Sequence, residues 1–444
     1  MSTQINIGKK IAILDEGSSI TTDVSQINFT GTGITATASG NNVTVNVTGS
    51  SGVWGISDAS GVYTYYATLQ LAINAATSGQ VIEMFADVTA TTLITLKDGV
   101  IIQGNGHTYT YSGNTGHVFQ AATSGTYLYM NMNIKRANTA TSTGAIFYGG
   151  SGFNSYPVFK FSNVNVTYTT TTGTAPIYAT DGSSRITFDG INVIGNSSGY
   201  LFDGSYIILA IKNSIIENTG AGGCINTGNY GARISFENLY LKTVSGTCIF
   251  MNYASDVIIN STAISSTGIG MAGQSGASAY DCYAFSNTSN AFNGLVCHNC
   301  TGQTTTGIAF YLCSGYNITG RSTTGFTVRP FSSMSKFYNS SFYSSGNITV
   351  YDLDYGASFY NCSIITDYNN AAGHAISIGP SSGNPAFVNN YIQVTNASAN
   401  CIKGTNSFSA AITGNAYKSA TTPVNANVTQ TITNTKDNQG NILI

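Results

Sequence analysis

The sequence carries little charge. Only 8% of its 444 residues are Asp, Glu, Lys or Arg, and the formal net charge is -2. The 16 Lys and Arg form no basic run, which argues against nucleic acid as a partner, because phosphate binding needs clustered cations. Disordered chains are poor in aromatic residues. This chain has 28 Tyr and 21 Phe. We therefore expect a folded protein that does not bind nucleic acid.

Long apolar runs are missing as well. No segment approaches the roughly 18 consecutive apolar residues of a membrane-spanning helix. Residues 1–10 contain no apolar core of a secretory signal. The sequence therefore predicts no membrane insertion and no export by the general secretory route.

Proline is scarce, with 6 residues against 50 Gly, as a chain of many hydrogen-bonded strands requires. The eight cysteines are placed as buried positions of a repeat rather than as disulfide partners. Cys224 and Cys248 open matching phrases one repeat apart, and Cys401 opens the phrase again. We expect β-structure with small polar turns and free, buried thiols.

A short phrase recurs along the chain: a large apolar residue, any residue, Asn, two variable residues, and another apolar residue. Steps between copies from 161 to 280 are 27, 23, 25, 22 and 22 residues. Such a period indicates a solenoid, with Asn at a turn where it tolerates the left-handed conformation and bonds to the next rung. The anchors from Ile102 to Ile412 predict about fourteen rungs. The copies begin at Phe161, Phe188, Ile211, Phe236, Ile258, Tyr280, Phe337, Phe359, Phe387 and Ile412.

The run ATLQLAINAATSGQVIEMFADVT, followed by GVIIQGNG, resembles the entry coil of pectate-lyase-like right-handed parallel β-helices. With the repeats, the resemblance covers about residues 55–420, and it implies an all-β solenoid over 53–420. An amphipathic helix near 65–77, predicted from Tyr65 to Ala76 with Leu69 and Ile73 on its apolar face, would cap the open end. Residues 421–444 fall outside the repeat and are expected to form a C-terminal tail or cap.

Residues 1–52 differ from the rest. Alternation over Ile27–Thr37 and Val43–Val47, around a turn at 40–42, predicts a β-hairpin. The stretch resembles a short β-module near the N-termini of many tailed-bacteriophage structural proteins. That resemblance implies attachment to a virion through residues 1–52, assembly in the host cytoplasm, and, by similarity to phage spikes, a homotrimer.

Two pairs of acidic residues are candidates for glycoside hydrolysis, which needs two carboxyl groups. In Tyr351-Asp352-Leu353-Asp354-Tyr355, a strand would place both Asp on one face about 7 Å apart. Tyr351 and Tyr355 would then stack on a sugar as the glycan-binding residues. A weaker pair is Asp181 and Asp203, each followed by Gly. Neither pair lies in a catalytic motif of the polygalacturonases or pectate lyases.

The segment Cys297-His298-Asn299-Cys300 has the spacing of a metal knuckle or redox pair, but no second ligand pair follows it. The segment is better explained as a turn Asn flanked by two buried positions of the repeat. The sequence thus predicts no metal site and no cofactor.

The favoured interpretation is a bacteriophage fibre or spike, of head or tail, that binds a host-surface glycan or protein receptor, or decorates the particle, without catalysis. The alternative is a tailspike depolymerase that cleaves capsule or O-antigen polysaccharide, with Asp352 and Asp354 as acid and base. A secreted adhesin or lyase is disfavoured because no signal is visible.

Overall fold

The structure, a computed structural model, divides into two compact units, residues 1–76 and 77–444. It describes residues 3–15, 18–29, 34–39, 42–47 and 52–443, apart from the short segments named here. Those segments are 114–115, 122–123, 138–144, 149–156, 170–177, 180–184, 204–207, 228–234, 275, 331–334, 347, 352–356, 371–372, 380–384, 405–407, 419–423, 425–427, 434 and 437–441.

Two antiparallel hairpins begin the first unit. β1 (Thr3–Asp15) pairs with β2 (Ser18–Phe29), and β3 (Ile34–Ser39) pairs with β4 (Asn42–Val47). The β3–β4 pair confirms the predicted hairpin. The alternation predicted as one strand over 27–37 is shared between β2 and β3 instead.

A third hairpin and a helix complete this unit. β5 (Trp54–Ser57) pairs with β6 (Tyr63–Tyr66), where the sequence predicted a linker and the first turn of the helix. Helix α1 (Leu69–Ala75) starts later than predicted, because residues 63–66 are paired in β6. Thr68 caps the helix: its Oγ1 accepts a hydrogen bond from the Leu71 N–H at 3.3 Å. The capping role of α1 stays a prediction.

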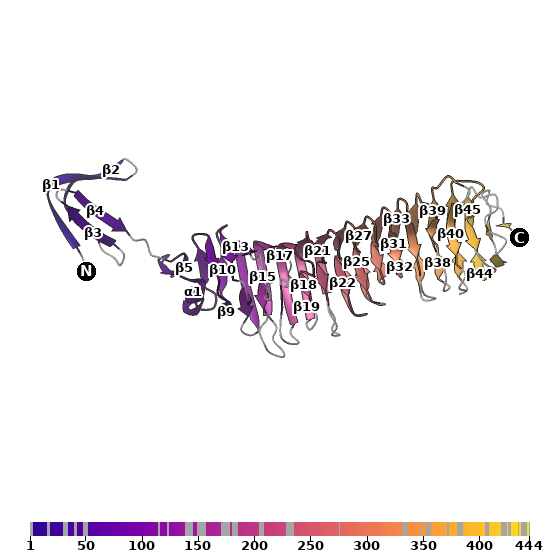
Figure 1. The fold of residues 1–444 in the computed structure, drawn as a ribbon, viewed down its shortest axis with the longest axis horizontal. Helices are drawn as coiled ribbons and strands as arrows, with labels where there is room; N and C mark the ends of the chain where they lie inside the picture. The colour runs from indigo at the N-terminus through magenta and orange to yellow at the C-terminus, as the bar shows by residue number, and fades with distance from the viewer. Residues whose placement is uncertain are drawn as a thin grey trace. The chain divides into compact units, whose positions relative to one another are not determined.

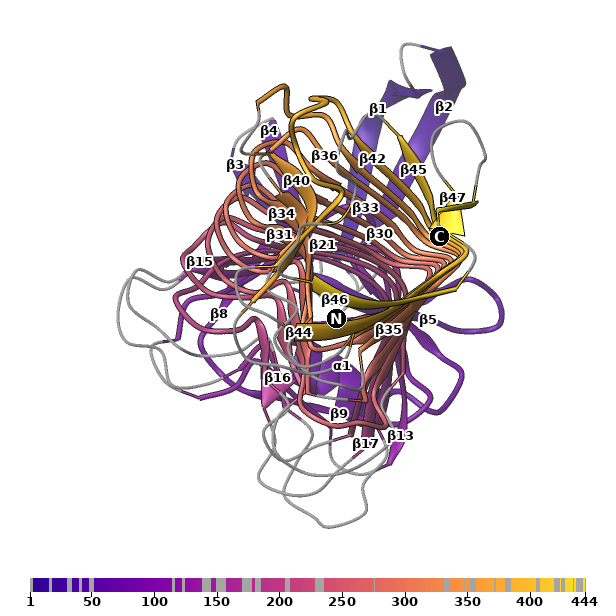
Figure 2. The same ribbon diagram turned by 90° about the vertical axis from the view of Figure 1, so that its right-hand side faces the viewer.

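The second unit is a parallel β-helix whose strands stack in three columns (Figure 1). Looking along the stack, corresponding strands of successive coils lie over one another (Figure 2). The first column contains β7 (Val81–Met84), β10 (Ile101–Gln103), β13 (Gly125–Ala137), β15 (Pro157–Thr169), β17 (Arg185–Asn196), β19 (Ile208–Asn218), β21 (Ser235–Thr243), β23 (Val257–Ile259), β26 (Ser278–Tyr280), β29 (Val296–His298), β32 (Ser314–Tyr316), β35 (Lys336–Tyr338), β38 (Ser358–Tyr360), β41 (Ala386–Val388), β44 (Phe408–Thr413) and β46 (Val428–Thr433).

The long strands β13, β15, β17, β19 and β21 run on into the second column, so the two columns form one sheet. The other second-column strands are β8 (Val88–Ala90), β11 (Thr108–Tyr111), β24 (Thr262–Ser265), β27 (Tyr283–Ser286), β30 (Thr301–Thr304), β33 (Thr319–Ser322), β36 (Ser341–Ser344), β39 (Ser363–Thr366), β42 (Tyr391–Val394), β45 (Ala416–Lys418) and β47 (Thr435–Lys436).

The third column is a separate 14-stranded sheet, and the first-column strands from β10 to β44, which span the predicted anchors Ile102 to Ile412, also number fourteen, as predicted. Its strands are β9 (Ile94–Leu96), β12 (Phe119–Ala121), β14 (Phe147–Tyr148), β16 (Tyr178–Ala179), β18 (Phe202–Asp203), β20 (Ile225–Asn226), β22 (Ile249–Met251), β25 (Met271–Gly273), β28 (Phe292–Asn293), β31 (Ile308–Tyr311), β34 (Phe326–Arg329), β37 (Ile348–Val350), β40 (His374–Ile378) and β43 (Ile402–Gly404). No helix of the described residues is long and apolar enough to cross a membrane.

The recurring Asn of the sequence forms the bend between the first two columns. One residue per coil has a positive φ there, as predicted, and Gly190 and Gly414 replace Asn in two coils. Side-chain amides connect neighbouring bends: Asn260 Nδ2 donates to Asn238 Oδ1 at 2.7 Å, and Asn299 Nδ2 donates to Asp281 Oδ1 at 3.0 Å. The other positive-φ residues of this bend are Asn105, Asn131, Asn163, Asn213, Asn317, Asn339, Asn361 and Asn389.

One predicted copy is out of register. The sequence placed an apolar anchor at Tyr280, but Ala279 is the residue that pairs with the buried Ile258. Asp281, with φ 54°, takes the place of Asn at this bend, so Tyr280 points outward and is 36% exposed. Because Ala279 is small, a search for large apolar residues did not identify it as the anchor.

In several coils the residue after the bend is Ser, Cys or Asn, lies inside the coil and satisfies backbone groups there. Ser340 Oγ donates to the Tyr338 carbonyl at 2.8 Å and accepts from the Ile318 N–H at 3.2 Å. Cys362 Sγ donates to the Tyr360 carbonyl at 3.3 Å in the same way. The polar residues of the recurring phrase therefore serve the scaffold.

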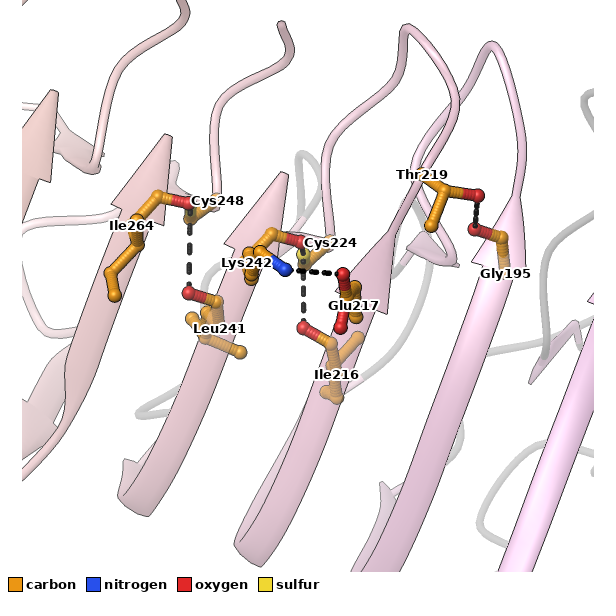
Figure 3. Close-up of polar contacts among 9 residues, drawn as sticks. All are labelled: Gly195, Ile216, Glu217, Thr219, Cys224, Leu241, Lys242, Cys248 and Ile264. Carbon is orange, nitrogen blue, oxygen red and sulfur yellow. Dashed lines mark hydrogen bonds and ion pairs between the residues drawn. The ribbon is translucent and has the colours of Figure 1, made fainter. Parts of the chain in front are cut away.

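All eight cysteines are buried and free, as predicted. Cys224 and Cys248 occupy matching positions in consecutive coils, and their Sγ atoms donate to the carbonyls of Lys242 and Ile264, each at 3.2 Å. Figure 3 labels these four residues. Burial raises the pKa of the Cys362 thiol to about 11 and that of Cys401 to about 12. Cys362 and Cys401 are therefore neutral packing groups at physiological pH.

The parallel pairing continues beyond the predicted repeat. β46 pairs with β44, and β47 pairs with β45, both in parallel. β48 (Ile442–Leu443) then pairs antiparallel with β47. The segment predicted as a tail therefore includes a further layer of the first two columns, and the reversal of direction occurs at its last strand.

Candidate binding surface

Tyr351, one of the predicted glycan-binding residues, follows β37 on the outward side of the third column. The register places Tyr311, Arg329 and Tyr351 beside one another in three consecutive coils, and all three are half-buried. The guanidinium carbon of Arg329 lies over both tyrosine rings, 5.8 Å from the Tyr311 centroid and 5.5 Å from the Tyr351 centroid. We call these three residues the Tyr–Arg–Tyr face.

Backbone hydrogen bonds of the coil hold the Tyr–Arg–Tyr face in place. The Tyr351 N–H donates to the Val328 carbonyl at 2.9 Å, and the Leu312 N–H donates to the Arg329 carbonyl at 3.0 Å. Leu312 adopts φ 57° directly after Tyr311, an uncommon conformation for a branched residue. The side chains are thus presented by rigid strand ends, which suits recognition better than a loop does.

The ring of Tyr351 does not offer an open face on both sides. Phe326 stacks on it with a centroid distance of 4.2 Å and an interplanar angle of 8°, and Arg329 lies over the ring as well. The predicted mode, a sugar stacked flat on Tyr351, is therefore hindered. What the face offers is a guanidinium, tyrosine hydroxyls and ring edges.

The remaining predicted site residues of this segment, Asp352, Asp354 and Tyr355, lie outside the described residues. Asp181, of the second pair, does too. Asp203 ends β18, and its Oδ1 accepts a hydrogen bond from Asn226 Nδ2 at 3.2 Å. Tyr178 pairs with Phe202, so the position that matches Asp203 in the preceding coil is Ala179 rather than Asp181. Asp203 belongs to a polar ladder of the third column.

A second set of outward rings lies just before the bends. Tyr280, His298, Tyr316, Tyr338 and Tyr360 stack in consecutive coils, with centroid distances of 4.6, 5.0, 4.9 and 4.8 Å and interplanar angles of 3–9°. We call this set the ring ladder. Because the rings cover one another face to face, only edges and hydroxyls meet the solvent, and the ladder mainly stabilises neighbouring strands.

The segment Cys297-His298-Asn299-Cys300 has the scaffold role favoured by the sequence. Cys297 and Cys300 are fully buried, Asn299 forms the bend with φ 53°, and His298 belongs to the ring ladder. Burial raises the pKa of the Cys297 thiol well above its usual value. The described side chains include no group of three or more His, Cys, Asp or Glu placed to share a metal ion.

The sequence search missed Phe326 and Arg329, although a signal was present. Each of the three coils contains an apolar residue, Ala or Thr, an apolar residue and then a large outward residue: Ile308 to Tyr311, Phe326 to Arg329, and Ile348 to Tyr351. Aligning this phrase, rather than the Asn phrase, would have placed Arg329 between the two tyrosines.

Comparisons with known proteins add little. No family model matches the chain, and no curated protein matches it. Among solved structures, the chain is similar to the A-module of mannuronan C-5 epimerase AlgE6 from Azotobacter vinelandii, with 11% identity and a TM-score of 0.35, over 83% of this chain and 93% of that one. So distant a likeness carries no argument about activity, and the assignment as a parallel β-helix rests on the strand pairings.

Proposed function

We propose that this chain is a non-catalytic fibre or spike protein of a bacteriophage particle that binds a host-surface polysaccharide. The observation that carries the binding role is the Tyr–Arg–Tyr face, in which two partly exposed tyrosines flank a cation on rigid strand ends. Such side chains combine an apolar body with polar tips, which is the usual chemistry of carbohydrate and protein recognition.

The attachment role rests on residues 1–52, whose sequence resembles phage N-terminal modules. Its described strands pair as hairpins, β1 with β2 and β3 with β4. Small hairpins need partner surfaces for stability, which other virion proteins would supply. Three chains in a spike would present three equivalent faces, so weak single contacts would add up to firm attachment.

Incubation of the intact protein with panels of capsular and O-antigen polysaccharides tests the binding role. We expect retention of at least one polysaccharide without release of new reducing ends. Cleavage that Asp352→Asn abolishes would contradict the non-catalytic proposal and establish the depolymerase. If no polysaccharide in a panel that includes the host's own is retained, the binding role is wrong.

Attachment is tested separately, by deleting residues 1–52 and following incorporation into particles. The shortened chain should keep the circular dichroism spectrum of the β-helix but be absent from purified virions. Incorporation at the level of the intact chain would refute the attachment role and leave the binding role standing.

A further inference from the structure

We propose that the Tyr–Arg–Tyr face recognises the carboxylate of an acidic sugar, so that the polysaccharide bound is a uronate-type or similarly acidic one. This inference rests on the proposed function and names the substrate class of the same site. Arg329 is the anion contact, and Tyr311 and Tyr351 position it.

The positioning of Arg329 is the first observation in favour. Its guanidinium carbon lies over one ring in the preceding coil and one in the following coil, and Pro330 directly follows it at the end of β34. Rings on both sides reduce the rotamer freedom that a bare surface Arg would lose on binding. A guanidinium has five N–H donors in a planar fork that matches a carboxylate, more than any single neighbour can accept.

The occupied rings are the second observation. Phe326 stacks on Tyr351, and the Arg329 guanidinium lies over the rings of Tyr311 and Tyr351. Neutral sugars depend on flat contact with open aromatic faces, and these contacts occupy ring faces of the site. The guanidinium and the tyrosine hydroxyls are its polar groups, which favours an anionic ligand.

The charge along this column is the third observation. The register continues from Tyr351 to Ser377 and Lys403, and in the other direction from Tyr311 to Asn293. From Asn293 to Lys403, the described outward positions of the column therefore hold two cations and no carboxylate. Asp352 and Asp354, which follow Tyr351 in sequence, are the nearest acids along the chain, and the experiment includes them.

The test compares each retained acidic polysaccharide with its carboxyl-reduced form, in which every uronic acid has become the neutral hexose of the same stereochemistry. The intact protein should bind the reduced form about tenfold to a hundredfold more weakly, as expected for loss of a charge-assisted hydrogen bond. Arg329→Gln should weaken binding to the native polysaccharide by a similar factor and leave binding to the reduced form unchanged.

Arg321→Gln is the matched control, because Arg321 is exposed on β33 of the second column. It should leave both affinities unchanged. Arg329→Lys should recover part of the loss, since it keeps the charge without the fork. Asp352→Asn and Asp354→Asn should leave the preference for the acidic form in place. Thermal unfolding verifies that every variant is folded.

Equal binding of native and reduced polysaccharide, or an equal loss from Arg321→Gln, would overturn this inference. Retention of neutral polysaccharides that Arg329→Gln does not affect would also overturn it, while leaving the proposed function intact. Failure to retain any polysaccharide would remove the proposed function itself, so the two failures are distinguishable.

Discussion

The coils near Phe188 and those near Cys297 are built on the same bend, but they distribute their aromatic rings differently between the inside and the outside of the coil. In the former, Phe147, Phe159, Phe188 and Phe202 pack together inside the coil. In the latter, inward positions of the second column hold small residues such as Ala284 and Gly302, the rings of Phe292 and Phe310 stack inside, and further rings form the outward ring ladder.

Coil length accounts for the difference. Successive bends near Phe188 lie 27 and 23 residues apart, at 163, 190 and 213, whereas those at 281, 299 and 317 are 18 apart. A shorter coil encloses a narrower interior: a Cβ on Gly302 would approach the rings of Phe310 and Phe292 to 3.0 and 3.1 Å. The narrow coils therefore combine buried rings with small inward residues, whereas the wide coils pack several rings together.

The largest expected effect on stability comes from a substitution in the interior of the wide coils. Phe188→Ala removes a fully buried ring whose centroid lies 5.4 Å from that of Phe159 and 5.2 Å from that of Phe202. We expect a loss of about 3–5 kcal/mol in the free energy of unfolding. Cys297→Ala, in the narrow interior, should cost only about 1 kcal/mol. Urea denaturation measures both, and equal losses would mean that coil width does not govern the packing.

The buried His374 makes the stability of the C-terminal coils depend on pH, because burial disfavours its charged form. His374 is 5% exposed, and burial, with a smaller contribution from Lys403, lowers its pKa to about 4. The unfolded chain therefore takes up the proton first, near pH 6.5, so stability falls as the pH drops from about 6.5 to about 4. The full shift corresponds to on the order of 3 kcal/mol.

Denaturation midpoints at pH 7, 5.5 and 4 measure this loss. His374→Gln should flatten the pH dependence over the same window, because the replacement does not titrate. An unchanged slope in that variant would assign the acid sensitivity to other groups.

The bend that both regions share is tested at Asn299. Its side chain donates to Asp281 and accepts from Asn317 Nδ2 at 3.3 Å, and its φ is 53°. Asn299→Ala should cost about 2 kcal/mol, from the strained backbone and the lost bonds. Asn299→Gly should cost about half as much, since Gly190 and Gly414 form the same bend. A Gly variant as unstable as the Ala variant would show that the amide ladder, not the backbone, is decisive.

The smallest effects are expected for the outward side chains at the position just before the bend, which form two kinds of ladder. In the wide coils this position holds Lys212 and Glu237, with Nζ 3.5 Å from Oε2, and in the narrow coils it holds rings such as Tyr316 and Tyr338. Double-mutant cycles to Ala should give coupling energies of about 0.5 kcal/mol for either pair. Added salt should weaken the ion pair alone. Equal salt sensitivity would contradict a packing role for the rings.

Much of this architecture follows from the sequence alone, because a coil repeats its local demands. Asn at a left-handed bend and an apolar anchor two residues before it recur along the chain, so the solenoid, the number of coils and the free thiols were all predictable. The predictions were wrong where the local signal was weak: the anchor at Ala279, and the start of α1, which a paired strand, β6, delays.

Only the tertiary structure decided which side chains meet across coils. Arg329 and Tyr351 are 22 residues apart in sequence, and the shared phrase that ends in each of them indicates matching positions but not the contact between their side chains. Their contact depends on the register of β34 with β37, set by Val328 opposite Val350, and so does the stacking of Phe326 on Tyr351. Sequence periodicity determines which face of a strand a residue occupies, but register determines its neighbours, and recognition at the Tyr–Arg–Tyr face depends on neighbours.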